Sequence, residues 1–83
     1  MEYRVYIIRN LQGKRYIGLS ENVITRLAQH NGNKSTHTKY RGPWTLEWTS
    51  RPMTLSEAVT LERKMKRQKG GQGLQTLMEV YGS

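Results

Sequence analysis

The chain has 83 residues, with 14 Lys and Arg against six acids, a net charge of +8 and no cysteine. This length predicts one small domain spanning residues 1–83, and the lack of cysteine excludes disulfides and thiolate metal sites. No run approaches the roughly 18 apolar residues of a membrane span and no signal-peptide pattern opens the chain, so we expect a cytoplasmic protein without a membrane partner. The positive charge favours a polyanion partner, most commonly nucleic acid; a basic chain that is merely soluble is the alternative.

Two strands are predicted at the start of the chain. Residues 3–8 are β-branched or aromatic, and residues 14–18 form their hairpin partner after a turn-like stretch. Alternation puts even-numbered residues of the first strand, including Tyr6, on one face and odd-numbered ones, including Val5, on the other. Tyr6 and Tyr16 then lie opposite or diagonal, depending on the loop register. They are either a cross-strand core pair or part of a site for phosphate chemistry.

A helix is predicted over residues 20–30, with Ser20 as N-cap and Glu21 in its first turn. Arg26 and His30 are four residues apart and therefore lie on one side of this helix, beside its apolar stripe. The residues of that stripe are Val23, Ile24, Leu27 and Ala28.

Residues 31–43 are polar and basic and predict a loop, with room for a short helical turn. This loop is either a surface that grips a nucleic-acid backbone or a solvated basic segment. Its cations and interleaved aromatic rings are Lys34, His37, Lys39, Tyr40 and Arg41. Residues 44–49 then alternate and predict a half-buried strand with Trp44, Leu46 and Trp48 on one face.

Thr54 and Glu57 form a capping-box pattern that opens a helix running to about Gln68. Glu62 falls inside the apolar arc of this helix, where an isolated charge is costly. It is therefore either paired with Arg26 or another base, or bound to a metal. The apolar residues of the arc are Leu55, Ala58, Val59, Leu61 and Met65. The glycine-rich residues 70–73 end the helix, and a last short amphipathic helix carries Leu74, Leu77, Met78 and Tyr81.

Several short motifs follow one another in a defined order. Val5-Tyr6-Ile7 and Tyr16-Ile17-Gly18 lie about ten residues apart, and the later ones are residues 26–31, Gly42-Pro43-Trp44, and Glu57-Ala58 with Glu62 and Lys66. Together they resemble the GIY-YIG nuclease domain family over roughly residues 3–77. The chain is most similar to small standalone bacterial members, which resemble the N-terminal domain of the UvrC excinuclease subunit.

This resemblance implies an α+β fold, with a small three-stranded antiparallel sheet flanked by helices in the order β-β-α-(α)-β-α and a final helix. It also implies metal-dependent hydrolysis of DNA phosphodiester bonds, as in DNA repair or processing. By position, Tyr6 and Tyr16 would be the active-site tyrosines, Arg26 the phosphate-binding arginine and Glu62 the metal-binding carboxylate. His30 occupies a place where related domains carry histidine or tyrosine.

The chemistry that these residues can support is phosphodiester cleavage with one divalent ion. Glu62 would bind Mg²⁺ or Mn²⁺, because one carboxylate fits one ion that keeps several waters. Arg26 would contact the phosphate oxygens, and Tyr6 or Tyr16, with His30 as proton acceptor, would orient or deprotonate the attacking water.

Leu19 stands where the excinuclease branch carries a lysine, and Lys14 or Arg15 is the candidate replacement cation. The predicted partner is DNA, including branched or damaged DNA. Its predicted contacts are Lys14, Arg15, Lys34, Lys39, Arg41 and Lys66. Two alternatives stay open: a non-catalytic nucleic-acid-binding module on the same fold, and a domain that acts only with a larger protein partner.

Overall fold

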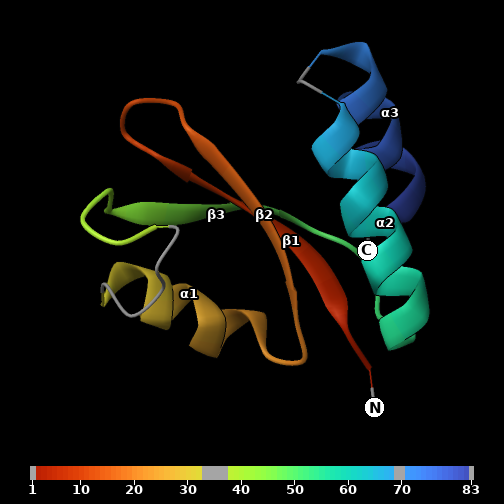
Figure 1. The fold of residues 1–83 in the computed structure, drawn as a ribbon, viewed down its shortest axis with the longest axis horizontal. Helices are drawn as coiled ribbons and strands as arrows, with labels where there is room; N and C mark the ends of the chain where they lie inside the picture. The colour runs from red at the N-terminus through yellow and green to blue at the C-terminus, as the bar shows by residue number, and fades with distance from the viewer. Residues whose placement is uncertain (1, 33–37, 69–70, 83) are drawn as a thin grey trace.

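The computed structural model describes residues 2–32, 38–68 and 71–82. The elements are β1 (Arg4–Asn10), β2 (Arg15–Ser20), α1 (Val23–Asn31), β3 (Trp44–Thr49), α2 (Leu55–Arg67) and α3 (Gln72–Tyr81). The strands form one antiparallel sheet in the order β2-β1-β3. Figure 1 shows α1 on one side of this sheet, with α2 and α3 side by side on the other. The predicted α+β class and order are confirmed, and the part of the chain described between α1 and β3 carries no further helix.

β1 is the centre of the fold because it pairs with a strand on each edge and is covered on both faces. Its odd-numbered Val5 and Ile7 pack against α2 and α3, while Tyr6 and Ile8 pack against Val23 of α1. All four β1 residues are at most 1% exposed. The alternation predicted for this strand is therefore confirmed, and it assigns Tyr6 to the face that α1 covers.

The hairpin register places the two tyrosines diagonally across β1 and β2. Tyr6 pairs with Gly18, and Tyr16 pairs with Ile8. The Asn10 side chain shapes the connecting turn, because its Oδ1 accepts hydrogen bonds from the backbone N–H of residues 12 and 14, at 3.1 and 2.9 Å. Of the two registers that the sequence allows, the structure adopts the diagonal one.

The prediction that Trp44, Leu46 and Trp48 share one face is wrong. Ile8 pairs with Leu46 but Ile7 pairs with Trp48, which leaves Glu47 as an extra residue on β3. Such a bulge reverses the facing of every residue beyond it. Trp44 therefore packs on the α1 side of the sheet, whereas Trp48 packs on the α2–α3 side.

The first helix begins later than predicted, at Val23 with Asn22 as its N-cap. The Asn22 Oδ1 accepts a hydrogen bond from the Thr25 N–H at 3.0 Å, whereas Ser20 ends β2, paired with Arg4. The stripe is also rotated: Ile24 is 73% exposed and Ala28 is exposed. The residues of α1 that turn toward the sheet, at spacings of three and four, are Val23, Arg26, Leu27 and His30.

The predicted capping box of α2 is present. The Thr54 Oγ1 accepts from the Glu57 N–H at 3.2 Å, and the Glu57 Oε1 accepts from the Thr54 N–H at 3.1 Å. Leu55 was assigned to the apolar arc but is 48% exposed. The remaining apolar face holds Ala58, Leu61 and Met65, all buried. In the part of the chain that is described, no helix is long and apolar enough to span a bilayer.

The final helix was predicted after a glycine-rich stop at residues 70–73. α3 forms, but it already starts at Gln72 and so contains Gly73. Leu74 is its buried residue, and Leu77, Met78 and Tyr81 pack around the same core. The Trp48 indole N–H donates to the Met78 carbonyl at 3.0 Å, which ties α3 to β3.

Candidate active site

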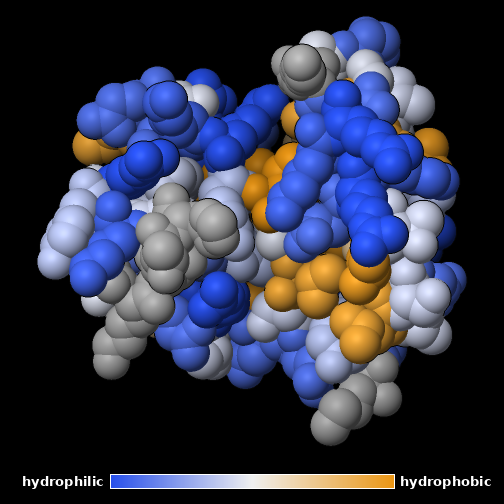
Figure 2. Space-filling view, in the orientation of Figure 1, coloured by the Kyte–Doolittle hydropathy of each residue, from blue (hydrophilic) through white to orange (hydrophobic). Residues whose placement is uncertain are grey.

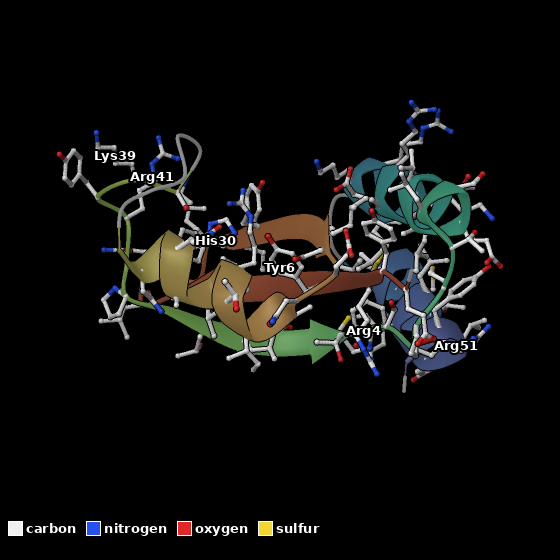
Figure 3. All side chains as sticks on the ribbon, turned by 90° about the horizontal axis from the view of Figure 1, so that it is seen from below. Arg4, Tyr6, His30, Lys39, Arg41 and Arg51 are labelled. Carbon is white, nitrogen blue, oxygen red and sulfur yellow. The ribbon has the colours of Figure 1, made fainter. Side chains whose placement is uncertain are left out.

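A buried chain of three polar side chains lies between the sheet and α1. The Tyr6 hydroxyl lies 2.8 Å from His30 Nε2, and His30 Nδ1 lies 2.6 Å from Thr38 Oγ1. Tyr6 is 1% exposed, and His30 and Thr38 are fully buried. Figure 3 shows His30, on α1, and Tyr6, on β1, close together. Burying polar groups of this kind is costly unless they are paired, so this chain specifies how α1 sits on β1.

The Tyr16 ring joins this cluster from β2. Its centroid lies 4.9 Å from that of His30 and 6.4 Å from that of Tyr6. Tyr16 is half-buried, whereas Tyr6 is closed off from solvent. The hairpin and α1 thus bring the two tyrosines and His30 together, with Tyr16 toward the surface.

Gly18 makes this arrangement sterically feasible. A Cβ at this position would lie 2.6 Å from the Tyr6 Oη and 3.1 Å from the Tyr16 Cε1. The first distance is shorter than real Cβ contacts allow, so any side chain here would displace the Tyr6 ring. Glycine is therefore needed at position 18 because the Tyr6 hydroxyl, on the neighbouring strand β1, occupies the space that a side chain would fill.

Two charged groups act on Tyr6 from different helices. Burial, together with the neighbouring Tyr16, raises the pKa of Tyr6 to about 12. Arg26 lowers this pKa through a hydrogen bond and its positive charge, whereas the negative charge of Glu62 raises it. Burial first, and Arg26 second, lower the pKa of His30. At neutral pH the Tyr6 phenol is therefore protonated and His30 is neutral. The Arg26 guanidinium also donates to Gln29 Oε1 at 2.8 Å.

Glu62 lies at the edge of the buried face of α2. Its side chain is 21% exposed, and its Oε1 lies 3.5 Å from Lys66 Nζ one turn later. The predicted pairing with a base is thus met by Lys66, and an exposed pair at this spacing contributes only a few tenths of a kcal/mol. Among the residues that the structure describes, no cluster of three His, Asp or Glu is able to bind a metal. One partly buried carboxylate fits an ion of the Mg²⁺ type that keeps most of its waters.

The remaining predicted nucleic-acid contacts fall into separate places. Arg15 makes a bidentate ion pair with Glu47, at 2.9 and 2.7 Å. It is next to Tyr16 in β2, and successive side chains of a strand face opposite sides of the sheet. Lys14 and Arg41 meet at a hollow near the β1–β2 turn, and Lys39 lies close by (Figure 3). Lys34 and His37 fall outside the described residues. Figure 2 shows hydrophilic side chains gathered around that turn and over the second half of α2.

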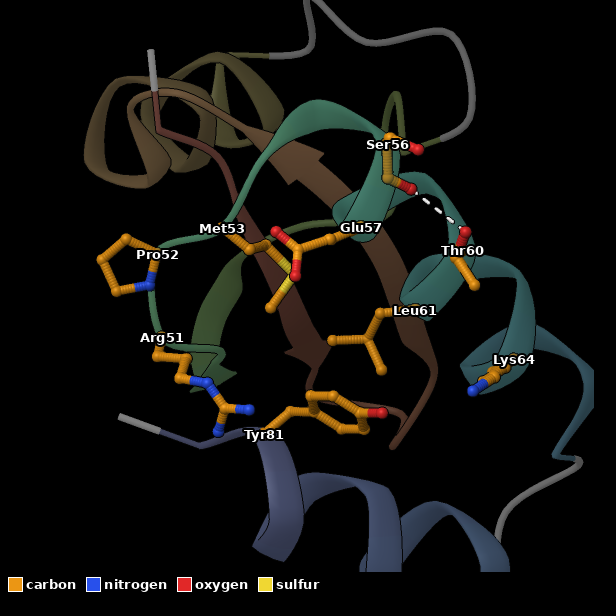
Figure 4. Close-up of a pocket in the computed structure, with 9 residues that line it drawn as sticks. All are labelled: Arg51, Pro52, Met53, Ser56, Glu57, Thr60, Leu61, Lys64 and Tyr81. Atoms are coloured by element: carbon orange, nitrogen blue, oxygen red, sulfur yellow. Dashed lines mark hydrogen bonds between the residues drawn. The ribbon is translucent and has the colours of Figure 1, made fainter.

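Another hollow, of about 280 Å³, lies on the α2–α3 side of the molecule (Figure 4). Its wall is partly apolar, with Met53 and Leu61, and the Arg51 guanidinium lies 5.3 Å from the centre of the Tyr81 ring. None of the residues that line it belongs to the tyrosine–histidine cluster. The tyrosine–histidine cluster, on the α1 side of the sheet, is therefore separate from this hollow.

The sequence model of the GIY-YIG catalytic domain matches residues 2–75, nearly the whole chain and every part of the cluster. This chain belongs to the GIY-YIG family. The predicted family, one of nuclease domains, is thereby confirmed.

Several bacterial relatives of this GIY-YIG domain are named only as UPF0213 protein. The one from Nitratidesulfovibrio vulgaris is 33% identical over 79 residues, 94% of this chain and 72% of that protein. The one from Staphylococcus epidermidis is 33% identical over 76 residues, 90% of this chain and 93% of that protein. The Aeromonas hydrophila protein is 32% identical over 65 residues, 77% of this chain. The chain spans about half the length of the Aeromonas relatives, 48% and 50%. No solved structure matches the chain.

The sequence did not predict the contacts by which three polar residues position the candidate site. Thr38 contacts His30, and no spacing in the sequence links a loop threonine to that helix. Asn31 holds the start of β3, because its Oδ1 accepts from the Trp44 N–H at 2.6 Å and its Nδ2 donates to the Trp44 carbonyl at 3.0 Å. Asn10 was seen only as a turn residue, yet its Nδ2 also donates to the Arg41 carbonyl at 3.1 Å.

Proposed function

We propose that this GIY-YIG domain is a metal-dependent endonuclease that hydrolyses DNA phosphodiester bonds in repair or processing. The observation that carries the proposal is the buried contact between Tyr6 and His30, with Tyr16 beside it and Arg26 and Glu62 acting on the phenol. An ordinary core would fill this space with apolar side chains, because polar groups there need partners. Perturbed titratable groups clustered in this way are typical of catalytic sites.

Arg26 is proposed to bind the scissile phosphate. Its guanidinium is half-buried and interacts with Tyr6 and Gln29, so its position is restrained before substrate arrives. A planar donor fork matches two non-bridging phosphate oxygens and stabilises the charge that develops on them.

The two tyrosines are proposed to differ in role. Tyr6 is closed off from solvent and its pKa is raised to about 12, so it acts as a protonated hydrogen-bonding group that holds the cluster together. Tyr16 is half-exposed, and its ring lies beside that of His30 at a tilt of 59°, so it is the phenol that can touch the attacking water. His30, neutral and contacted by Thr38 at Nδ1, is proposed to take up the released proton through the Tyr6 hydroxyl, which donates its own proton to Nε2 as it receives one.

Glu62 is proposed to hold a single Mg²⁺ or Mn²⁺. Such an ion, when bound, supplies positive charge to the phosphate and the leaving oxygen. Lys66 lies beside the same carboxylate and offers a second positive charge to a DNA backbone at this edge.

A cleavage assay tests the proposal with supercoiled plasmid and with branched DNA, in Mg²⁺ or Mn²⁺. Glu62→Gln and Arg26→Ala are expected to lower the rate by about 100-fold or more, which is typical for loss of a group that stabilises transition-state charge. Glu79→Gln on α3 and Arg63→Ala on α2 are matched controls, since both residues are exposed, and they should cut like wild type. DNA binding without cleavage by the wild type would instead support a binding module on this fold. Equal cleavage by all variants would place the activity elsewhere.

A further inference from the structure

A hollow of about 300 Å³ opens at the end of the sheet, beyond the residues given a catalytic role above. The β1–β2 turn forms one wall and the segment at residues 38–41 forms the other. The residues that line it are Asn10, Gln12, Lys14, Tyr40 and Arg41. Two cations, two amides and an aromatic ring at one small hollow form a mixture typical of nucleic-acid contacts, not of a protein core.

Both walls are held by the buried side chain of Asn10, which is 7% exposed. Its Oδ1 accepts from two backbone N–H groups of the turn, at 3.1 and 2.9 Å. Its Nδ2 donates across the hollow to the Arg41 carbonyl at 3.1 Å. The separation of the two walls is therefore set before any ligand binds, which lowers the entropic cost of binding.

Tyr40 presents a large ring at this hollow. It is 78% exposed, and it is the one non-glycine residue with positive φ, 63°, in the described parts of the chain. A bulky residue in the left-handed region is strained, and strain of this kind concentrates at ligand sites. Lys39 Nζ lies 5.1 Å from the ring centre, and Lys39 does not line the hollow. The Tyr40 ring therefore lies next to the Lys39 ammonium group and also lines the hollow.

The hollow and the candidate active site share one segment. Thr38 contacts His30 at 2.6 Å, and the Arg41 N–H donates to the Thr38 carbonyl at 3.2 Å. Tyr40 lies inside this turn. The segment that carries the Tyr40 ring therefore also contacts the candidate active site.

We propose that this hollow binds an unstacked nucleotide of single-stranded DNA. The base would stack on the Tyr40 ring, and Lys14, Lys39 and Arg41 would contact the adjoining phosphates. The inference rests on the proposed function for its choice of DNA, and it specifies the substrate class: DNA with an unpaired nucleotide next to the cut. A surface for intact duplex would use the cations alone, because paired bases do not offer their faces to a ring.

Binding measured in EDTA tests this independently of cleavage. Fluorescence anisotropy with labelled oligo-dT and with a blunt duplex of equal length compares wild type, Tyr40→Phe and Tyr40→Asn. Asparagine tolerates positive φ, so Tyr40→Asn removes the ring without adding backbone strain. We expect Tyr40→Asn to weaken oligo-dT binding by about 5- to 100-fold, and Tyr40→Phe to bind like wild type. Duplex binding should change by less than about twofold, because phosphate contacts dominate it.

Leu11→Asn is the matched control, since Leu11 is 83% exposed on the neighbouring turn, and it should leave oligo-dT binding unchanged. Photo-crosslinking of a strand carrying 5-iododeoxyuridine, followed by peptide mass spectrometry, should place the adduct on Tyr40. Unchanged oligo-dT binding by Tyr40→Asn, or adducts only elsewhere, would overturn the proposal. Tighter binding of oligo-U than of oligo-dT would overturn the assignment to DNA. A protein that cuts no DNA but shows the Tyr40 effect would refute the nuclease proposal and retain this one.

Discussion

The Tyr6 hydroxyl and His30 Nε2 lie 2.8 Å apart although the residues are 24 positions apart in the chain. Their contact joins the central strand to α1, and Thr38 occupies the other ring nitrogen. A neutral histidine carries one N–H, so two proton arrangements satisfy the chain. Either Tyr6 donates to Nε2 and Nδ1 donates to Thr38, or Thr38 donates to Nδ1 and Nε2 donates to Tyr6. The second arrangement leaves the Tyr6 proton for another acceptor.

Tyr6→Phe is expected to destabilise the fold by about 1–3 kcal/mol, because it leaves a buried nitrogen of His30 without its partner. Urea unfolding followed by circular dichroism measures this. Tyr3→Phe is the matched control: the Tyr3 hydroxyl donates to Glu21 at 3.0 Å in an exposed contact, so its loss should cost less than about 0.5 kcal/mol. Equal stability of Tyr6→Phe and wild type would contradict the role given to this contact.

Tyr16→Phe is expected to separate activity from stability. Under the proposed function it should lower the cleavage rate by about 100-fold, since the phenol would no longer contact the attacking water. Its unfolding free energy should change less than that of Tyr6→Phe, because Tyr16 is half-exposed and water can replace its partners. Single-turnover cleavage and urea unfolding on the same preparations provide the two measurements. The reverse pattern would exchange the roles of the tyrosines.

Gly18→Ala is expected to cost about 1–3 kcal/mol through overpacking, because the new methyl group would overlap the Tyr6 hydroxyl. Thermal unfolding measures the loss. Gly42→Ala provides the comparison, since a Cβ there meets its nearest atoms at an ordinary 3.4 Å. If the two variants have the same melting temperature, steric closeness at Gly18 is not what requires glycine.

The stability of the fold should fall as the pH is lowered through the usual pKa of histidine, 6.5. Burial, and then Arg26, lower the pKa of His30 in the folded state. Below 6.5 the unfolded chain therefore binds a proton that the folded chain does not, and protonation favours unfolding. Above 6.5 His30 is neutral in both states, so its contribution is fully present.

Urea midpoints at about pH 7.5 and about pH 5.5 test this, since histidine titrates between them. The drop should be smaller in His30→Gln, which cannot titrate. A drop of the same size in both proteins would assign the pH dependence to other groups.

Local sequence patterns predicted much of the secondary structure correctly. The capping box at Thr54 and the alternation along β1 depend on neighbours a few residues away, so the sequence alone contains the information. The motifs built on Tyr6 and Tyr16 indicated the family for the same reason, since their order and spacing are written along the chain. The start of α1 was missed because Ser20 and Asn22 are both good caps, and only the pairing of Ser20 with Arg4 in the sheet decided between them.

The sequence by itself therefore determined the class of the fold, the order of its elements and the face on which Tyr6 lies. Only the tertiary structure decided which side chains meet. The bulge at Glu47 sends Trp44 and Trp48 to opposite faces, and Thr38 reaches His30 from a different segment. Periodicity describes one element at a time, whereas a strand register or a contact between segments depends on how separate elements pair in space.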